Sequence, residues 1–147
     1  MNIELLPVLA SEFDTLFAAV KQGIYPYVEK VFGWDDGFQK RRLLEEYDPN
    51  WFYWIYFDKI RIGILCYKPY LNSLHIHLLI IFPQFQNRGF GDSIMTDVHE
   101  LASADNRKSI TLSSFILNKG AIRFYERLGY QIVESEDDFQ SFKIGIT

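Results

Sequence analysis

Hydrophobic side chains recur along the chain with two different periods. Segments of aliphatic and aromatic residues that are bounded by turn residues predict β-strands. Segments in which apolar residues recur every three or four positions predict helices. The predicted strands are residues 3–9, 51–57, 60–67, 74–82, 109–114, 130–134 and 141–146. The predicted helices are residues 11–33, 35–47, 92–104 and 118–128.

The order of these elements predicts a mixed α/β fold in a single domain that spans residues 1–147. We expect Ser11 to cap the first helix and Gly33 to end it. Pro26 lies inside that helix, so we expect a kink or a second helix start there. Segment 74–82 is apolar at nearly every position, which predicts a central strand that is covered on both faces.

Composition and charge narrow the classes of function. The chain has 147 residues, of which 48% are hydrophobic, so it can bury a core without disulfide bonds or a structural metal. Its 15 basic and 19 acidic residues give a net charge of −4, which argues against a nucleic-acid partner. The single cysteine, Cys66, fits a reducing compartment. Since no apolar run approaches a membrane span and the start lacks signal-peptide features, we expect a soluble cytoplasmic protein with no membrane partner.

A glycine-containing loop follows the apolar segment 74–82. It reads Gln86-Asn87-Arg88-Gly89-Phe90-Gly91. The first N–H groups of the next helix lack partners inside the helix, and the helix dipole favours an anion there. Glycines allow close approach and Arg88 adds positive charge, so the loop predicts a pyrophosphate site. Alternatively, the glycines only shape a turn. The spacing is not that of a P-loop, and Ile94 stands where a dinucleotide fingerprint needs its third glycine.

Two further patterns could carry chemistry. Asn118 is placed to cap the helix 118–128, and Tyr125 shares its face, although an ordinary amphipathic helix with a half-buried tyrosine also fits. His75 and His77 lie two positions apart and therefore project from one face of their strand, where imidazoles suit proton relay. They could instead be exposed or satisfied within the core. A third metal ligand at motif spacing is missing, so we expect no metal, and we expect His99 to be structural or solvated.

Together, the loop Gln-x-x-Gly-x-Gly and the segment Asn-x-x-Ala-x-x-Phe-Tyr-Glu-x-Leu-Gly-Tyr resemble the GNAT superfamily of acyl-CoA N-acyltransferases. The resemblance covers the element order of the whole chain and is most specific from Leu74 to Tyr130. It implies a mixed central sheet of six to seven strands, splayed in the middle and flanked by about four helices. It also implies acetyl-CoA as the co-substrate and no metal.

The resemblance implies roles for individual residues. The loop would bind the pyrophosphate of coenzyme A, and segment 79–81 would bind the pantetheine through its backbone. Asn118 would contact the pantetheine arm, and Tyr125 would protonate the departing thiolate. The cofactor-binding residues expected in this way are Leu79, Ile80, Ile81, Gln86, Asn87, Arg88, Gly89, Phe90, Gly91, Asp92, Asn118, Ala121 and Phe124.

The general base stays open between two residues. His75-x-His77 resembles the paired strand histidines of arylalkylamine acetyltransferases, whereas many family members carry a glutamate in this region and this strand has none. A base helps because an alkylammonium with a pKa near 10.4 is only about one part in a thousand neutral at pH 7.

The predicted reaction is direct attack of a primary amine on acetyl-CoA, with a histidine acting through water as base and Tyr125 as acid. The acceptor would be a small-molecule or a protein amine, and a non-catalytic coenzyme A-binding module is the alternative. Several aromatic residues near the first helices either line an acceptor pocket or belong to the core. They are Tyr25, Tyr27, Phe32, Trp34 and Trp51. The hairpin after Tyr130 offers an edge for a homodimer.

Overall fold

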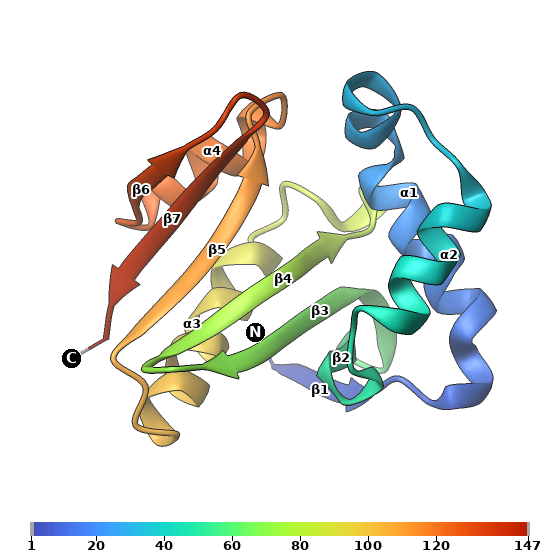
Figure 1. The fold of residues 1–147 in the computed structure, drawn as a ribbon. Coiled ribbons are helices and arrows are strands. Elements are labelled where there is room, and N and C mark those ends of the chain that lie inside the picture. The colour runs from blue at the N-terminus through green and yellow to red at the C-terminus, as the bar shows by residue number, and fades with distance from the viewer. Residues whose placement is uncertain (1, 147) are drawn as a thin grey trace. The chain divides into compact units, whose positions relative to one another are not determined.

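The computed structural model describes residues 2–146 and contains a mixed seven-stranded sheet with four α-helices (Figure 1). The strands are β1 (Ile3–Pro7), β2 (Phe52–Phe57), β3 (Ile60–Tyr70), β4 (Ser73–Ile81), β5 (Ser109–Phe115), β6 (Gln131–Ser135) and β7 (Phe139–Gly145). The helices are α1 (Phe13–Val31), α2 (Asp36–Glu45), α3 (Phe90–Ala104) and α4 (Lys119–Arg127). The strand order is β1-β2-β3-β4-β5-β7-β6, with β4 and β5 parallel. The predicted α/β class and element order are confirmed.

The chain divides into two compact units. The first unit comprises Met1–Cys66 and Leu78–Ile94, and the second comprises Tyr67–His77 and Met95–Thr147. Both units draw residues from β3, β4 and α3, because these three elements pass from one to the other.

The core of the first unit lies between two helices and two strands. In Figure 1, α1 and α2 run side by side. Buried side chains of these helices pack against buried side chains of β2 and β3. These residues are Leu16, Phe17, Val20, Leu43, Phe52, Trp54, Ile64 and Cys66. The helices are therefore held to the sheet by apolar burial rather than by their own propensity.

Gly63 allows an unusually close approach of β3 to β4. A Cβ atom at this position would lie 2.2 Å from the carbonyl oxygen of Ile80, a distance that real Cβ atoms do not adopt. Gly23 of α1 likewise leaves room for the Ile80 side chain, which would lie 2.7 Å from an added Cβ. Two glycines thus make room for Ile80, which lies in the part of β4 expected to bind pantetheine.

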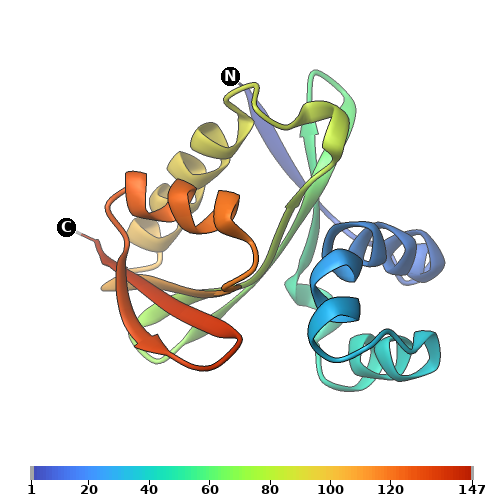
Figure 2. The same cartoon turned by 90° about the horizontal axis from the view of Figure 1, so that it is seen from above.

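The second unit places two helices on one face of its strands. Figure 2 shows α3 and α4 on the same side of β5 and β7. The side chains of Ile110, Leu112 and Phe142 point to this face and are at most 2% exposed. Val98 and Ala102 of α3 are fully buried, which completes a continuous apolar layer.

Three local expectations need revision. Ser11 does not cap α1: it lies in a short 3₁₀ helix, Ala10–Glu12, and α1 begins at Phe13. The carboxylate of Glu12 instead accepts a hydrogen bond from the Leu9 N–H at 2.8 Å. Pro26 does not restart the helix, since α1 is continuous through it. The missing proline N–H costs one hydrogen bond to position 22, and Gln22 is exposed, so water can serve its carbonyl.

The third correction concerns the central strand. β4 lies between β3 and β5 as expected, but His77 and the residues that follow it to Ile81 are half-buried rather than buried. The end of α1 agrees better with the sequence, because Gly33 follows the helix with a left-handed φ of 78°. Across residues 2–146, the helices are too short or too polar to cross a bilayer.

Candidate functional site

The predicted anion loop is the N-terminus of α3. The helix begins at Phe90, so Gly89 immediately precedes it and Gly91 lies in its first turn. Gly89 has a φ of 82° and Asn87 a φ of 59°, which turns the chain sharply into the helix. The first N–H groups of an α-helix have no intrahelical acceptor and carry partial positive charge. The geometry can therefore receive an anion.

The loop is tied to the end of β4. The side-chain amide of Gln86 donates a hydrogen bond to the carbonyl oxygen of Ile81 at 2.8 Å. This contact joins the loop to the strand segment that was expected to bind pantetheine. In the same segment, the carbonyl oxygen of Ile80 faces Gly63 of β3. The backbone groups of Leu79 and Ile81 point away from β3, because successive residues of a strand alternate in direction.

Arg88 places a cation beside the helix start. Its guanidinium lies 5.9 Å from the ring centroids of both Phe85 and Phe90, and it donates to the Gln84 carbonyl at 3.3 Å. Arg88 is exposed, so an anion can reach it. The carboxylate of Asp92 lies in the same first helical turn. The negative charge of this carboxylate interacts favourably with the helix dipole but repels a phosphate. Asp92 can therefore bind an anion only through its backbone N–H.

Asn118 and Tyr125 lie on α4. The Asn118 Oδ1 accepts a hydrogen bond from the N–H of Ala121 at 3.1 Å, which confirms the predicted N-cap. Tyr125 is only 7% exposed and contacts the rings of Phe124 and Phe142 at 5.1 and 6.0 Å between centroids. It is thus buried, not a half-buried surface residue. Burial raises the pKa of the Tyr125 phenol, so it stays protonated at neutral pH.

His75 and His77 project from the same face of β4, as the sequence predicts. Their ring centroids lie 4.8 Å apart, and His75 Nδ1 lies 2.8 Å from Thr111 Oγ1. Burial lowers the pKa of His75, and the positive charge of Lys68 lowers it further. Burial, followed by His75 and Lys68, lowers the pKa of His77 to about 4. Both imidazoles are therefore neutral at pH 7.

The strand register separates the histidines from the tyrosine. His75 pairs with Thr111 on one face, while Ile76 pairs with Leu112 on the other. Leu112 in turn pairs with Phe142, against which Tyr125 packs. His75 and Tyr125 consequently lie on opposite faces of the sheet in the second unit. The sequence could not show this arrangement, because it depends on the register between strands far apart in the chain.

A second contact that the sequence missed links α3 to the segment after α4. His99 Nε2 lies 3.2 Å from the hydroxyl oxygen of Tyr130, which is itself 3% exposed. The sequence contains one indication of this contact. His99 follows Met95 by four positions and precedes Ala102 by three, so it shares a helix face with these two buried residues.

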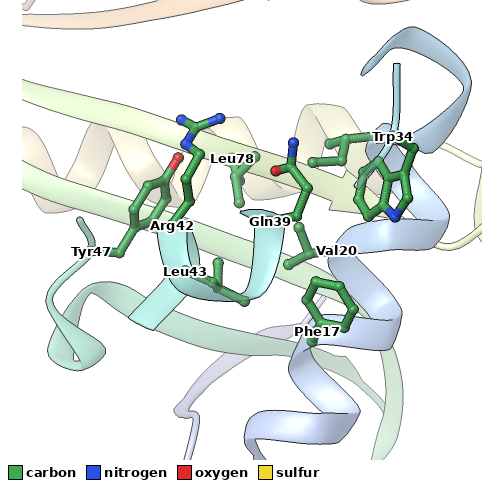
Figure 3. A pocket seen from close by; sticks show the side chains of 9 residues that line it. Phe17, Val20, Trp34, Gln39, Arg42, Leu43, Tyr47 and Leu78 are labelled. Carbon is green, nitrogen blue, oxygen red and sulfur yellow. The ribbon is translucent and has the colours of Figure 1, made fainter. Parts of the chain in front are cut away.

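A mostly apolar pocket opens in the first unit between α1, α2 and β4 (Figure 3). It is lined by Phe17, Val20, Ile24, Trp34, Gln39, Arg42, Leu43, Tyr47 and Leu78, and its cavity volume is about 30 Å³. Figure 3 shows the polar ends of Gln39, Arg42 and Tyr47 on one side of the pocket. Of the aromatic residues considered for an acceptor pocket, Trp34 lines it, Trp51 packs against the core and Phe32 is 64% exposed.

The part of the chain that the structure describes holds no group of three or more His, Cys, Asp and Glu residues suited to a metal ion. Residues 19–130 match the acetyltransferase (GNAT) family. The chain belongs to the GNAT family. The predicted resemblance is thereby confirmed.

Two curated relatives are described as N-acetyltransferases. An uncharacterized N-acetyltransferase of Methanocaldococcus jannaschii is 38% identical over 56 residues, which are 38% of this GNAT chain and 25% of the relative. An uncharacterized N-acetyltransferase of Schizosaccharomyces pombe is 27% identical over 105 residues, which are 61% of this chain and 43% of the relative. The matches thus span less than half the length of either relative.

Solved GNAT structures share the fold. The PaiA N-acetyltransferase of Thermoplasma acidophilum, crystallised with coenzyme A, aligns with a TM-score of 0.76 at 13% identity over 99% of both chains. An acetyltransferase of Thermus thermophilus aligns with a TM-score of 0.76 at 18% identity over 99% of this chain and 97% of its own. The ribosomal-protein-S18-alanine N-acetyltransferase of Escherichia coli gives 0.70 at 12% identity, over 99% and 95%. At these identities the likeness concerns the fold.

Proposed function

We propose that this GNAT chain transfers an acetyl group from acetyl-CoA to a primary amine. The observation that carries the proposal is the start of α3 at Phe90, inside the loop Gln86–Gly91. Helix N–H groups, a glycine turn and the Arg88 guanidinium suit a pyrophosphate. Charge-assisted hydrogen bonds contribute roughly 1.5–3 kcal/mol each, and several of them would support micromolar binding. Family membership and the coenzyme A bound to a structural relative favour this ligand.

In this proposal, the backbone of segment 79–81 binds the pantetheine arm, and Gln86 fixes the loop by its bond to Ile81. On the α4 side, the residues that would line the arm are Asn118, Ala121 and Phe124. The Oδ1 of Asn118 already caps the helix, so its amide NH₂ is the group that can donate to the arm.

The proposed acid is Tyr125. Its phenol is protonated because burial raises its pKa, and it can therefore donate a proton to the departing thiolate. The amine attacks the thioester carbon, the carbon–sulfur bond breaks, and the sulfur takes the phenolic proton. No covalent enzyme intermediate is needed for this sequence.

Of the two histidines, His75 is the better proposed base. Protonating a group with a pKa of about 4 at pH 7 costs about 4 kcal/mol, and His77 has such a pKa. His75 is held by Thr111, which fixes its ring. Because the histidines and Tyr125 lie on opposite faces, the proton lost by the amine and the proton gained by sulfur would move on opposite faces of the sheet.

We further propose that the pocket between α1 and α2 receives a small apolar group of the acceptor, since its cavity of about 30 Å³ is small. Leu78 lines the pocket and directly precedes Leu79, which is proposed to bind the donor. An acceptor in this pocket would thus lie next to the donor along one strand. The polar ends of Gln39, Arg42 and Tyr47 could orient a polar group of the same molecule (Figure 3). The net charge of −4 mildly favours a cationic amine.

A calorimetric titration with coenzyme A tests the loop. We expect micromolar affinity for the wild type and no measurable binding for Gly89→Glu, because a carboxylate would face the pyrophosphate. Gly33→Glu is a matched control: Gly33 also has a left-handed φ, 78° against 82°, and an added Cβ there meets nothing within 4 Å. Equal affinity in the two variants, or no heat from the wild type, contradicts the proposed site.

Thioester consumption with a panel of small amines and of peptides tests the reaction. Release of free thiol that depends on an amine supports the transferase. Turnover with peptides alone identifies a protein N-acetyltransferase. Tight coenzyme A binding without turnover on any amine identifies a non-catalytic binding module.

A further inference from the structure

Tyr130 lies directly against Tyr125, although the proposed reaction assigns it no role. The two ring centroids are 5.6 Å apart, with 63° between the ring planes. The Tyr130 N–H also donates to the Tyr125 carbonyl oxygen at 3.0 Å. Tyr130 therefore contacts Tyr125 through both its backbone and its side chain, and its ring forms one wall of the site that holds the Tyr125 ring.

His99 fixes the hydroxyl of Tyr130. Its Nε2 lies 3.2 Å from that oxygen, and the two rings meet edge-on at 6.1 Å between centroids. Tyr130 is 3% exposed, so its hydroxyl would be costly to bury without such a partner. The contact spans 31 positions of the sequence and connects α3 to Tyr130, three positions after the end of α4. The apolar layer between the helices and the sheet thus contains the polar contact between His99 and Tyr130, and Tyr130 lies beside Tyr125.

The two phenols are electrostatically coupled. Burial raises the pKa of Tyr130, and the charge of Tyr125 raises it further. When Tyr125 gives its proton to a leaving group, Tyr130 therefore keeps its own. The Tyr130 ring thus stays neutral, and because His99 fixes it, it limits the positions that the neighbouring Tyr125 ring can take.

We propose that Tyr130, with its hydroxyl fixed by His99, is a positioning residue that acts on the proposed reaction through Tyr125. This inference rests on the proposed function, in which Tyr125 is the acid. It assigns to His99 a role that its place on α3 alone would not indicate.

A double-mutant cycle tests the inference. We expect Tyr130→Phe to lower kcat roughly five- to tenfold, with the KM for acetyl-CoA and the affinity for coenzyme A changed less than about twofold. Because Tyr130 acts through Tyr125, the double variant Tyr125→Phe/Tyr130→Phe should be no slower than Tyr125→Phe alone. A residue that merely supports the fold would add its own loss in the double variant. An unchanged kcat in Tyr130→Phe, or additive losses, overturns the inference.

Substitutions of His99 give a second readout. His99→Gln keeps a donor and an acceptor near the Tyr130 hydroxyl and should retain most of the activity, whereas His99→Leu should match the loss in Tyr130→Phe. Equal losses in Gln and Leu variants that keep the wild-type urea midpoint overturn the role of His99.

Tyr56→Phe is the matched control. It also removes a phenol that takes part in one partly buried hydrogen bond, here accepting from Arg61 Nε at 3.0 Å, and it should leave kcat unchanged. The outcomes separate the two proposals. A wild type that neither binds coenzyme A nor consumes acetyl-CoA overturns the proposed function and this inference together. An active wild type with an indifferent Tyr130 overturns the inference alone.

Discussion

The Tyr125 hydroxyl is placed where its loss should affect chemistry more than binding. The ring is buried among aromatic side chains, so Tyr125→Phe preserves the packing and removes only the proton donor. We expect kcat to fall by about 100-fold, the lower end of the range for general acid catalysis, and the affinity for coenzyme A to stay within about twofold. Steady-state kinetics together with calorimetry check this. Turnover equal to that of the wild type would remove Tyr125 from the mechanism.

His77 should make the stability of the protein depend on pH. Its folded pKa of about 4 lies below the unfolded value of 6.5, so between these values the unfolded chain binds a proton that the folded chain does not. The contribution of His77 to the free energy of unfolding should therefore be fully present above pH 6.5 and should be lost as the pH drops toward 4. The half-buried position reduces the effect to about 1 kcal/mol. Urea unfolding at pH 7 and pH 5 should show a smaller loss for His77→Gln than for the wild type. Equal losses would contradict the assignment.

Residue types and spacing predicted several side chains of the candidate site correctly. The cap made by Asn118 follows from its position before an amphipathic segment, and the shared face of His75 and His77 follows from strand pleating. The burial of Tyr125 and the His99–Tyr130 contact did not follow. Both depend on which helix covers which face of the sheet, and helical periodicity alone cannot show that.

At the scale of one element, Gly63 determines how closely β3 approaches β4. We expect Gly63→Ala to destabilise the protein by about 3 kcal/mol or to displace β4, because the added Cβ would lie 2.2 Å from a backbone oxygen that cannot rotate away. Coenzyme A affinity should fall with it, since Leu79 and Ile80 would move.

Gly145→Ala is the control for this prediction. Gly145 also lies in a strand, β7, but an added Cβ there meets nothing within 4 Å, so stability and affinity should hold. Thermal melts and calorimetry of the two variants decide the matter. Similar behaviour of both would show that the contact at Gly63 relaxes without cost.

The elements themselves were predictable where one pattern dominated. The runs of aromatic and branched residues predicted β2, β3 and β4, and the left-handed pair Asp58 and Lys59 forms the expected turn. At Pro26 two signals competed in the sequence, a helix-breaking residue and apolar helical periodicity. Burial of Val20 and Val28 on either side of Pro26 keeps α1 continuous.

At the scale of the whole molecule, the two compact units should unfold together. β3, β4 and α3 contribute residues to both, so neither unit can lose its structure without breaking an element of the other. All three tryptophans, Trp34, Trp51 and Trp54, lie in the first unit. We therefore expect tryptophan fluorescence and far-UV circular dichroism to report the same urea midpoint. Separate midpoints would show that residues 1–147 are not one cooperative domain.

The order of the elements carried enough information to place the chain in its family. The loop after β4 and the segment from Asn118 to Tyr130 each contain residues suited to cofactor binding or catalysis. Each also lies at a defined place in the order of strands and helices. The separation of His75 from Tyr125 by the sheet was beyond the sequence, because it follows from pairing between β4, β5 and β7.

Helix α3 runs without interruption from the glycine loop to His99 and beyond. At 1.5 Å per residue, the nine steps from Phe90 to His99 span about 14 Å, and each step turns the chain by about 100°. One inserted or deleted residue in that stretch would place the His99 imidazole on another face of the helix and shift it along the helix axis. Natural homologues that keep this histidine should therefore vary in length at the 58–59 and 134–138 turns, but not between Phe90 and His99.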